Sequence, residues 1–398
     1  MRKILILSPC DIFPPVHGSS SAVYYTVKYL SKNNLLTILL TRLYSQNGTM
    51  DLFHPNIDIN YCRKNVLDRL GYKSLLFNSW YFKAAYDIMK KSNSDIIQCE
   101  LLWTALPGIL LKKIFKKPLI LVEENVEYLK FKQFNMFPYF TYLIRKLESL
   151  SCKIADKIVA VSEVDKSHIM RLYDVPKEKI SVISHCIDPD VFKYDEQKRN
   201  LVRNKLGIGS DKVVLTFVGK LDYLPNVKAV EYIAKEIYPV VIKKEPNLKF
   251  LIIGQNYEHL MYYANQNFIF TGFVDSRANI SLNLSDYLSA SDIVLVPLDS
   301  GSGTRLKILE AAACSRPVVS TRVGAEGEDF AENKEILITD KVDSEFIANV
   351  MRLIENKELR YKIGENARKK IMKKYIWKKE IDKFKEIYEE LLKARGMS

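Results

Sequence analysis

The chain has 398 residues, of which 47% are apolar, so two to three domains can each bury a sizeable core. Its net charge of +13 is concentrated in the first half and the C-terminal tail, which suits an anionic membrane or an acidic substrate. The sequence has no nucleic-acid motif, no pair of cysteines at Cys-x-x-Cys spacing and no apolar run of membrane-spanning length. These features predict a cytoplasmic protein with reduced thiols and without a signal peptide, a metal site or a bound nucleic acid.

The first half of the chain alternates short apolar strands with amphipathic helices. Strands are expected at 3–8, 35–42, 57–62, 95–100, 118–125, 157–163 and 180–187, and helices at 19–32, 75–91, 105–115, 139–155 and 165–173. Alternation at this spacing predicts βα units and a parallel sheet.

A second alternating series begins after a polar link that follows Asp188. Strands are expected at 213–219, 248–254, 267–274, 292–298, 317–321 and 335–340, and helices at 227–243, from 257, at 282–289, 344–355 and 359–373. A last helix at 377–393 lies outside both series. The pattern therefore predicts two doubly wound α/β domains that meet near residue 190, with ligand bound at the carboxyl ends of the strands.

The loop after the buried strand at 292–298 carries the most informative motif. Gly301 and Gly303 let backbone N–H groups come close to a ligand, and a helix is expected to begin near Thr304. The first amides of a helix have no intrahelical partner, and its N-terminus is the positive end of the helix dipole. This loop is therefore suited to bind a phosphate or a diphosphate.

Two cations and a carboxylate follow this loop. Arg305 and Lys307 would strengthen the attraction for a diphosphate, whereas Glu310 lies in an apolar run where a carboxylate needs a partner or a ligand hydroxyl. The alternative is a surface helix with a Lys307–Glu310 ion pair, which stabilises a helix by only a few tenths of a kcal/mol.

The stretch from 301 to 327 resembles the donor-binding signature of family-4 (group 1) glycosyltransferases of the GT-B fold. The matching parts are the glycine turn Gly301 and Gly303, Glu310-Ala311, Pro317 to Ser320, and Gly324 to Gly327. In such enzymes the glutamate that matches Glu310 binds the donor ribose, and the loop with the helix N-terminus holds the diphosphate. The family often has a second glutamate that holds the donor sugar, and this chain has Ser302 there.

Further positions are assigned through the same resemblance, which covers essentially the whole chain. Gly18 matches one glycine of the family's acceptor and phosphate loop and Ser19 replaces the other, with a plain N-cap loop as the alternative. Lys220 matches a basic residue that contacts the donor phosphates, whereas the family's second basic residue is replaced by Asn226. Glu124 stands where many relatives have a histidine that contacts the donor sugar, and it would hydrogen-bond sugar hydroxyls or assist an oxocarbenium-like centre.

The resemblance also implies the architecture and the reaction. We expect two Rossmann-like domains facing each other across a cleft, with residues 1–190 on the acceptor side and 196–375 binding the donor, and the helix at 377–393 packing back on the first domain. We expect a retaining, metal-independent, hexosyltransferase-like enzyme of glycan biosynthesis. It would move a sugar from a UDP- or GDP-linked donor to a glycan, lipid-linked or protein-linked acceptor, without a cofactor.

Each predicted site residue has a stated role in that reaction. The expected catalytic residues are Lys220, Arg305, Lys307 and Glu124; the expected donor-binding residues are Gly301, Ser302, Gly303, Thr304 and Glu310; and the expected acceptor and phosphate loop holds Gly18 and Ser19. Two alternatives stay open: a nucleotide-sugar epimerase of the same fold, and a non-catalytic nucleotide-sugar-binding subunit.

Aromatic and basic residues are interleaved between Tyr128 and Lys146. Such a mixture is typical of a membrane interface, where rings lie at the headgroup level and cations meet anionic lipid. This interpretation predicts an enzyme peripheral to the cytoplasmic face of the membrane with a lipid-linked acceptor. The alternative is a partly buried helix followed by a flexible acceptor loop, because aromatic residues more often serve the core.

Overall fold

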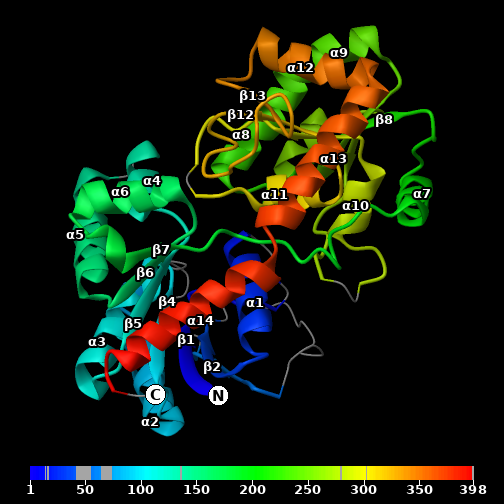
Figure 1. The fold of residues 1–398 in the computed structure, drawn as a ribbon. Helices are drawn as coiled ribbons and strands as arrows, with labels where there is room; N and C mark the ends of the chain where they lie inside the picture. Colours follow the sequence, from blue (N-terminus) through cyan, green and yellow to red (C-terminus); the bar gives the residue numbers. More distant parts are fainter. Residues whose placement is uncertain are drawn as a thin grey trace. The chain divides into compact units, whose positions relative to one another are not determined.

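The computed structural model describes residues 1–13, 15, 18–41, 55–63, 74–134, 137–277, 280–301 and 303–396 (Figure 1). The chain folds into two compact units, and each unit is built on one parallel sheet. The first unit comprises Met1–His185, Ser302–Thr304 and Trp377–Ser398, and the second comprises Cys186–Gly301 and Arg305–Ile376. The expected fold class of two parallel α/β domains is thereby confirmed.

The first unit has a seven-stranded sheet among its described residues, in the order β3-β2-β1-β4-β5-β6-β7. Its strands are β1 (Arg2–Leu7), β2 (Asn34–Leu40), β3 (Ile57–Tyr61), β4 (Ile96–Glu100), β5 (Leu119–Glu123), β6 (Lys157–Ala160) and β7 (Ile180–Val182). The strand order reverses between β1 and β4, so the loops after these strands diverge, and ligands bind at such a point in open α/β sheets.

Helices flank this sheet, and several begin with a side-chain cap. They are α1 (Gly18–Leu30), α2 (Ser79–Ser92), η2 (Leu102–Thr104), α3 (Ala105–Phe115), α4 (Glu127–Gln133), α5 (Pro138–Ile154), α6 (Glu163–Tyr173), η3 (Lys177–Lys179) and α14 (Trp377–Lys393). Asn78 accepts hydrogen bonds from the first amides of α2, and Ser162 does the same for α6. Both residues are therefore N-caps that satisfy otherwise unpaired donors.

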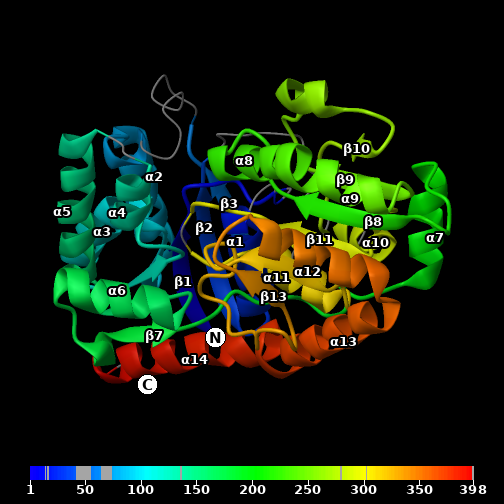
Figure 2. The ribbon, with the colours of Figure 1, turned by 90° about the horizontal axis from the view of Figure 1, so that it is seen from above.

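Helix α14 comes from the C-terminal end of the chain and belongs to the first unit (Figures 1 and 2). The ring of Trp377 stacks on Tyr29 of α1, with ring centroids 6.0 Å apart. The buried hydroxyl of Tyr388 donates a hydrogen bond to Oε1 of Gln98 on β4 at 2.6 Å. These contacts join residues from opposite ends of the sequence, so α14 is part of the fold of the first unit.

The second unit has a six-stranded sheet among its described residues, in the order β10-β9-β8-β11-β12-β13. Its strands are β8 (Val213–Val218), β9 (Leu248–Ile253), β10 (Phe268–Phe270), β11 (Ile293–Val296), β12 (Val318–Thr321) and β13 (Leu337–Thr339). Its helices are α7 (Glu196–Lys205), α8 (Leu224–Tyr232), η4 (Ile233–Ile237), α9 (Tyr238–Lys244), η5 (Glu258–Tyr263), α10 (Leu284–Ala290), α11 (Leu306–Ala313), α12 (Ser344–Glu355) and α13 (Lys357–Lys374). The strands read as continuous apolar runs because helices cover both faces of a parallel sheet.

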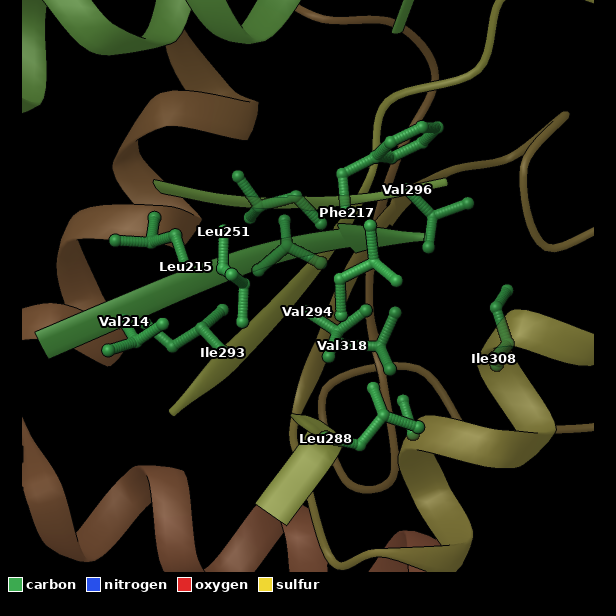
Figure 3. Packing of buried hydrophobic residues seen from close by; sticks show 14 of the residues in the cluster. Val214, Leu215, Phe217, Leu251, Leu288, Ile293, Val294, Val296, Ile308 and Val318 are labelled. Carbon is green, nitrogen blue, oxygen red and sulfur yellow. The ribbon is translucent and has the colours of Figure 1, made fainter. Parts of the chain in front are cut away.

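Figure 3 shows how side chains of this sheet pack together. Phe217 of β8, Val294 of β11 and Val318 of β12 are buried, and Ile308 of α11 contributes to the same cluster. Burying α11 through such residues holds the helix beside the central strands. The loop that precedes α11 is therefore anchored at the carboxyl edge of this sheet.

Three arginines bind the last carbonyls of α10. Arg199 donates to Ser289 O at 2.9 Å, Arg203 to Ala290 O at 3.0 Å, and Arg316 to Ser291 O at 3.0 Å. The C-terminus of a helix is the negative end of its dipole and has unpaired carbonyls, so guanidinium groups stabilise it. Asp292, at the start of the segment that leads into β11, pairs with two of these arginines.

Helix boundaries differ from the sequence expectation at three places in the second unit. The helix expected at 227–243 is divided into α8, the π-helical turn η4 and α9, since Pro239 has no N–H for the usual bond to the residue four positions earlier. The segment from 257 forms only the short 3₁₀ helix η5. The helix expected near Thr304 begins at Leu306.

Candidate active site

The loop before α11 depends on two glycines with positive φ. Gly301 has φ 122° and Gly303 has φ 75°, a region that side chains other than glycine rarely adopt. A Cβ atom on Gly301 would lie 2.8 Å from Nη2 of Arg305. The predicted glycine turn is therefore required by this backbone, whereas Ser302 lies outside the described residues.

The N-terminus of α11 already contacts a carboxylate. The amide of Arg305 donates a hydrogen bond to Oε1 of Glu328 at 3.1 Å, and Leu306 is the first helical residue. The expectation that the amides near Thr304 open the helix is corrected in this respect. A carboxylate at this position is favoured by the helix dipole, as a phosphate would be. The sequence reasoning missed Glu328, although this residue directly follows the Gly-Ala-Glu-Gly loop.

Lys307 is a residue of α11, and the ammonium at the end of its side chain lies near the carboxyl end of β8. Its Nζ donates a hydrogen bond to Oδ1 of Asn226 at 3.0 Å and lies 4.3 Å from the centroid of the Phe217 ring. Desolvation, and secondarily the charge of Arg305, lower the pKa of Lys307 to about 7, while Glu310 opposes this change. The ammonium group of Lys307 is therefore only partly protonated near neutral pH.

Asn226 connects this lysine to the end of β8. Its Nδ2 donates to the carbonyl oxygen of Lys220 at 2.9 Å, and its side chain is 8% exposed. A Cβ atom on Gly219 would lie 2.7 Å from the Asn226 amide, so only glycine leaves room for it. The sequence indicated only that Asn226 replaces a basic residue of the family. It could not show the contact with Lys307, because Lys307 is far away in the chain.

Glu310 is 8% exposed on the buried side of α11. Burial raises the pKa of Glu310 to about 7, and the charge of Lys307 acts in the opposite direction. The surface-helix alternative does not hold for this residue, since Glu310 is buried with the alanines that follow it. The Glu310 carboxyl and the Lys307 ammonium thus both have pKa values shifted toward neutrality, as groups at many binding sites do.

Lys220 ends the β8 segment, and its ammonium lies 3.3 Å from Oδ2 of Asp222. Its side chain is 24% exposed, so solvent or a ligand can reach it. Lys228, which lies on α8, pairs with Asp299 at 3.2 Å. Lys220, Asn226, Lys307 and Glu310 therefore gather around one edge of the second sheet, and their roles toward a ligand stay predictions.

Two family models match the chain. Residues 16–191 match Glycosyltransferase Family 4, and residues 212–356 match Glycosyl transferases group 1. The chain belongs to the family-4, group 1 glycosyltransferases. The recognition made from the 301–327 signature is thereby confirmed, and so is the expectation that the protein is a glycosyltransferase.

Relatives and solved structures agree with this assignment. An uncharacterized glycosyltransferase of Methanocaldococcus jannaschii is 28% identical over 98% of this chain and 100% of its own length. The UDP-Gal:alpha-D-GlcNAc-diphosphoundecaprenol alpha-1,3-galactosyltransferase of Escherichia coli is 23% identical over 77% of this chain and 78% of its own.

Among solved structures, sucrose-phosphate synthase from Thermosynechococcus elongatus has a TM-score of 0.82 at 16% identity and covers 99% of this chain and 100% of its own. Anabaena HepE, in complex with UDP and glucose, has a TM-score of 0.72 at 14% identity and covers 98% and 100%. These likenesses show the GT-B fold of this glycosyltransferase.

In the first unit of the glycosyltransferase, two predicted residues meet. The carboxyl group of Glu124, which follows β5, is hydrogen-bonded to the side chain of Ser19 on α1. Burial raises the pKa of Glu124 to about 7, and the bond from Ser19 acts against this. Gly18 is exposed as the first residue of α1. The fold thus joins the predicted acceptor loop to the carboxylate at the end of β5.

Gly303 and Thr304 group with the first unit by their contacts. Within that unit, Oγ1 of Thr304 and Nδ1 of His185 lie 2.6 Å apart. Burial lowers the pKa of His185 to about 4, so its ring is neutral at physiological pH. The predicted donor-binding role of Gly303 and Thr304 stays a prediction.

Beside Glu124 lies a second carboxyl group, that of Glu123, which is 1% exposed. Neither of its oxygens has a hydrogen-bond partner among the described residues. Burial raises the pKa of Glu123 well above its usual value, and the nearby Glu148 and Glu127 add to the effect. The described residues contain no group of three or more His, Cys, Asp or Glu side chains arranged to hold a metal ion.

The predicted aromatic and basic run divides between core and surface. Phe131 is buried, whereas Phe137, Tyr139 and Tyr142 are 79%, 75% and 52% exposed at the start of α5. Across the described residues, no helix combines the length and apolarity needed to cross a bilayer. Three aromatic side chains are therefore exposed to solvent at the start of α5.

Proposed function

We propose that this glycosyltransferase transfers a hexosyl residue from a UDP- or GDP-linked donor with retention of anomeric configuration and without a metal ion. The observation that carries the proposal is the gathering of Lys220, Lys307 and Glu310 at one edge of the second sheet. HepE, which shares the fold, is described in complex with UDP and glucose, and this supports a nucleotide-sugar donor.

Departure of the nucleoside diphosphate from the anomeric carbon is the step that needs charge stabilisation. The leaving group gathers negative charge, and Lys220, Arg305 and Lys307 would offset it from fixed positions. At an effective dielectric constant near 20, a cation about 4 Å from a phosphate charge contributes roughly 4 kcal/mol before desolvation. Three such cations are a sufficient source of stabilisation, which is why we propose that no metal is required.

Glu310 would bind the ribose of the donor. A buried carboxylate with a pKa near 7 is costly to keep ionised, and two ribose hydroxyls would supply the hydrogen bonds that favour the ionised form. A diphosphate would likewise favour the protonated form of Lys307. Donor binding is therefore expected to leave this pair charged.

The first unit would supply the acceptor side. The carboxyl group of Glu124, hydrogen-bonded to Ser19, would accept hydrogen bonds from sugar hydroxyls or stabilise positive charge at the anomeric centre when it is ionised. With a pKa of about 7, its ionised fraction changes across physiological pH. Retention requires no carboxylate pair if the departing phosphate takes the proton of the acceptor hydroxyl.

A panel of labelled nucleotide sugars tests the proposal. Release of nucleoside diphosphate that depends on an added acceptor, with an α-linked product from an α-linked donor, is the expected result, and added EDTA should leave the rate unchanged. An isomerised donor would indicate an epimerase. Binding without turnover on any acceptor would indicate a non-catalytic subunit.

We further propose that the acceptor is lipid-linked and that α5 contacts an anionic membrane. The name of the Escherichia coli relative includes a diphosphoundecaprenol acceptor, which supports the lipid. Exposed Tyr139 and Tyr142 lie on α5 together with the exposed cations Arg145 and Lys146, and exposed Phe137 directly precedes this helix. Aromatic rings at the headgroup level, with about 1 kcal/mol per nearby cation, are sufficient for reversible attachment.

Co-sedimentation with vesicles tests the membrane contact. Wild-type protein should sediment with phosphatidylglycerol-containing vesicles at low salt, and the triple variant Phe137→Ser, Tyr139→Ser, Lys146→Glu should not. Tyr361→Ser is the matched control, because Tyr361 is 70% exposed on α13 of the second unit. Equal sedimentation of both variants, or none by the wild type, would reject the α5 contact and favour an acceptor in solution.

A further inference from the structure

The side-chain amide of Asn226 donates one hydrogen bond and accepts another. Its Nδ2 donates to the carbonyl of Lys220 at 2.9 Å, and its Oδ1 accepts from Nζ of Lys307 at 3.0 Å. The first bond fixes which end of the amide is the oxygen, so that the oxygen alone is available to the lysine. An amide is the side chain of this size that can do both, since a carboxylate would repel the Lys220 carbonyl and an aliphatic group would bind neither.

The position of Lys307 depends on this amide. Lys307 projects from α11 and reaches the end of β8, where its Nζ lies over the face of Phe217 at 4.3 Å from the ring centroid. A lysine has a long flexible side chain, and ordering it costs conformational entropy unless contacts hold its end. Within the part of the chain that the structure describes, the aromatic face and the Asn226 oxygen hold this ammonium at the carboxyl end of the strand.

We propose that Asn226 is a positioning residue that keeps the ammonium of Lys307 protonated and directed for the donor diphosphate. This inference rests on the proposed nucleotide-sugar donor and adds to it a residue that does not itself contact the ligand. The cation comes from α11, but Asn226 on α8 determines where its charge is presented.

The charged groups around Lys307 explain why the neutral amide of Asn226 can affect the protonation of this lysine. Arg305 disfavours the ammonium and Glu310 favours it, and both lie on or next to α11. From the end of β8, Lys220 and Asp222 form an ion pair of their own at 3.3 Å. Because desolvation already brings the pKa of Lys307 to about 7, loss of one hydrogen bond to the ammonium would lower its protonated fraction further.

The test is the pH dependence of UDP binding, measured by titration calorimetry from pH 6 to 9. Wild-type affinity should fall as Lys307 loses its proton. In Asn226→Ala the fall should occur about one pH unit lower, and in Asn226→Asp about one unit higher, as expected for losing or strengthening one charge-assisted hydrogen bond. Lys307→Arg should remove the fall, because a guanidinium stays charged throughout this range.

Two controls separate positioning from general damage. Asn356→Ala removes an N-cap of α13 in the same unit and should keep the wild-type pH profile, including the part due to ionisation of UDP itself. Thermal denaturation establishes that each variant is folded. Opposite displacements by Ala and Asp are a signature that a merely structural asparagine would not produce.

The outcomes distinguish this inference from the proposed function. If wild-type protein binds UDP with a pH-dependent affinity and neither Asn226 variant displaces the profile, Asn226 is not a positioning residue. If the wild type binds neither UDP nor GDP at any pH, the proposed donor itself is wrong.

Discussion

Replacing Glu310 by glutamine should make the protein more stable and its donor binding weaker. Burial raises the pKa of this carboxyl from 4.5 to about 7 in the folded state. The folded protein therefore holds a proton that the unfolded chain releases between these pH values, and its stability falls as the pH rises from 4.5 to 7. At about 1.4 kcal/mol per pH unit, the loss is about 3 kcal/mol above pH 7.

Glutamine has nearly the same shape and carries no charge, so Glu310→Gln should recover up to about 3 kcal/mol above pH 7 and nothing at pH 4. The same change removes the carboxylate proposed to accept hydrogen bonds from ribose. Loss of charged hydrogen bonds of about 1.5 to 3 kcal/mol should weaken UDP binding by roughly 10- to 150-fold. A residue kept at a cost in stability is typical of a binding site.

Two measurements check this prediction. Denaturant titration at pH 4 and pH 8, followed by a probe in the second unit, gives the change in stability, and calorimetry with UDP gives the change in affinity. Glu236→Gln is the matched control, since Glu236 is exposed on η4 and should alter neither quantity. A folded Glu310→Gln variant with wild-type affinity and no gain in stability at pH 8 would refute both the burial argument and the ribose assignment.

Three further changes have expected outcomes. Lys220→Ala should lower kcat by roughly 10²–10³ at saturating donor if this cation stabilises the leaving group, and an unaltered kcat in steady-state kinetics would assign it to the solvated surface. Glu123→Gln should raise the temperature midpoint of unfolding at pH 7.5 and not at pH 4. Burial raises the pKa of the unpartnered Glu123 carboxyl, so the folded wild-type protein becomes less stable as the pH rises through that range. A midpoint that increases equally at both pH values would contradict the role of ionisation. Tyr388→Phe should destabilise the first unit by about 1–3 kcal/mol through loss of the buried bond to Gln98, with UDP affinity unchanged, and calorimetry together with thermal denaturation would detect any departure from this pattern.

Local sequence pattern was sufficient to predict the two sheets. The strand at 292–298 and its neighbours are continuous apolar runs. Their alternation with helical segments indicates parallel βα units, and this pattern can be read without knowing the contacts made by the rest of the chain. The glycines at 301 and 303 are equally local, because the backbone of one loop determines that φ must be positive there. The family could be recognised for the same reason, since its signature is contained within residues 301–327.

Contacts between distant segments could not be read in this way. Asn226 and Lys307, which are hydrogen-bonded, are 81 residues apart in the chain, and Arg305 and Glu328 are 23 residues apart. Whether Lys307 is a solvated cation or a desolvated one with a pKa near 7 depends on the side chains packed around it. Periodicity reports which face of an element is apolar, whereas burial, hydrogen-bond partners and proton affinity are set by what that face is packed against, and this only the tertiary structure determines.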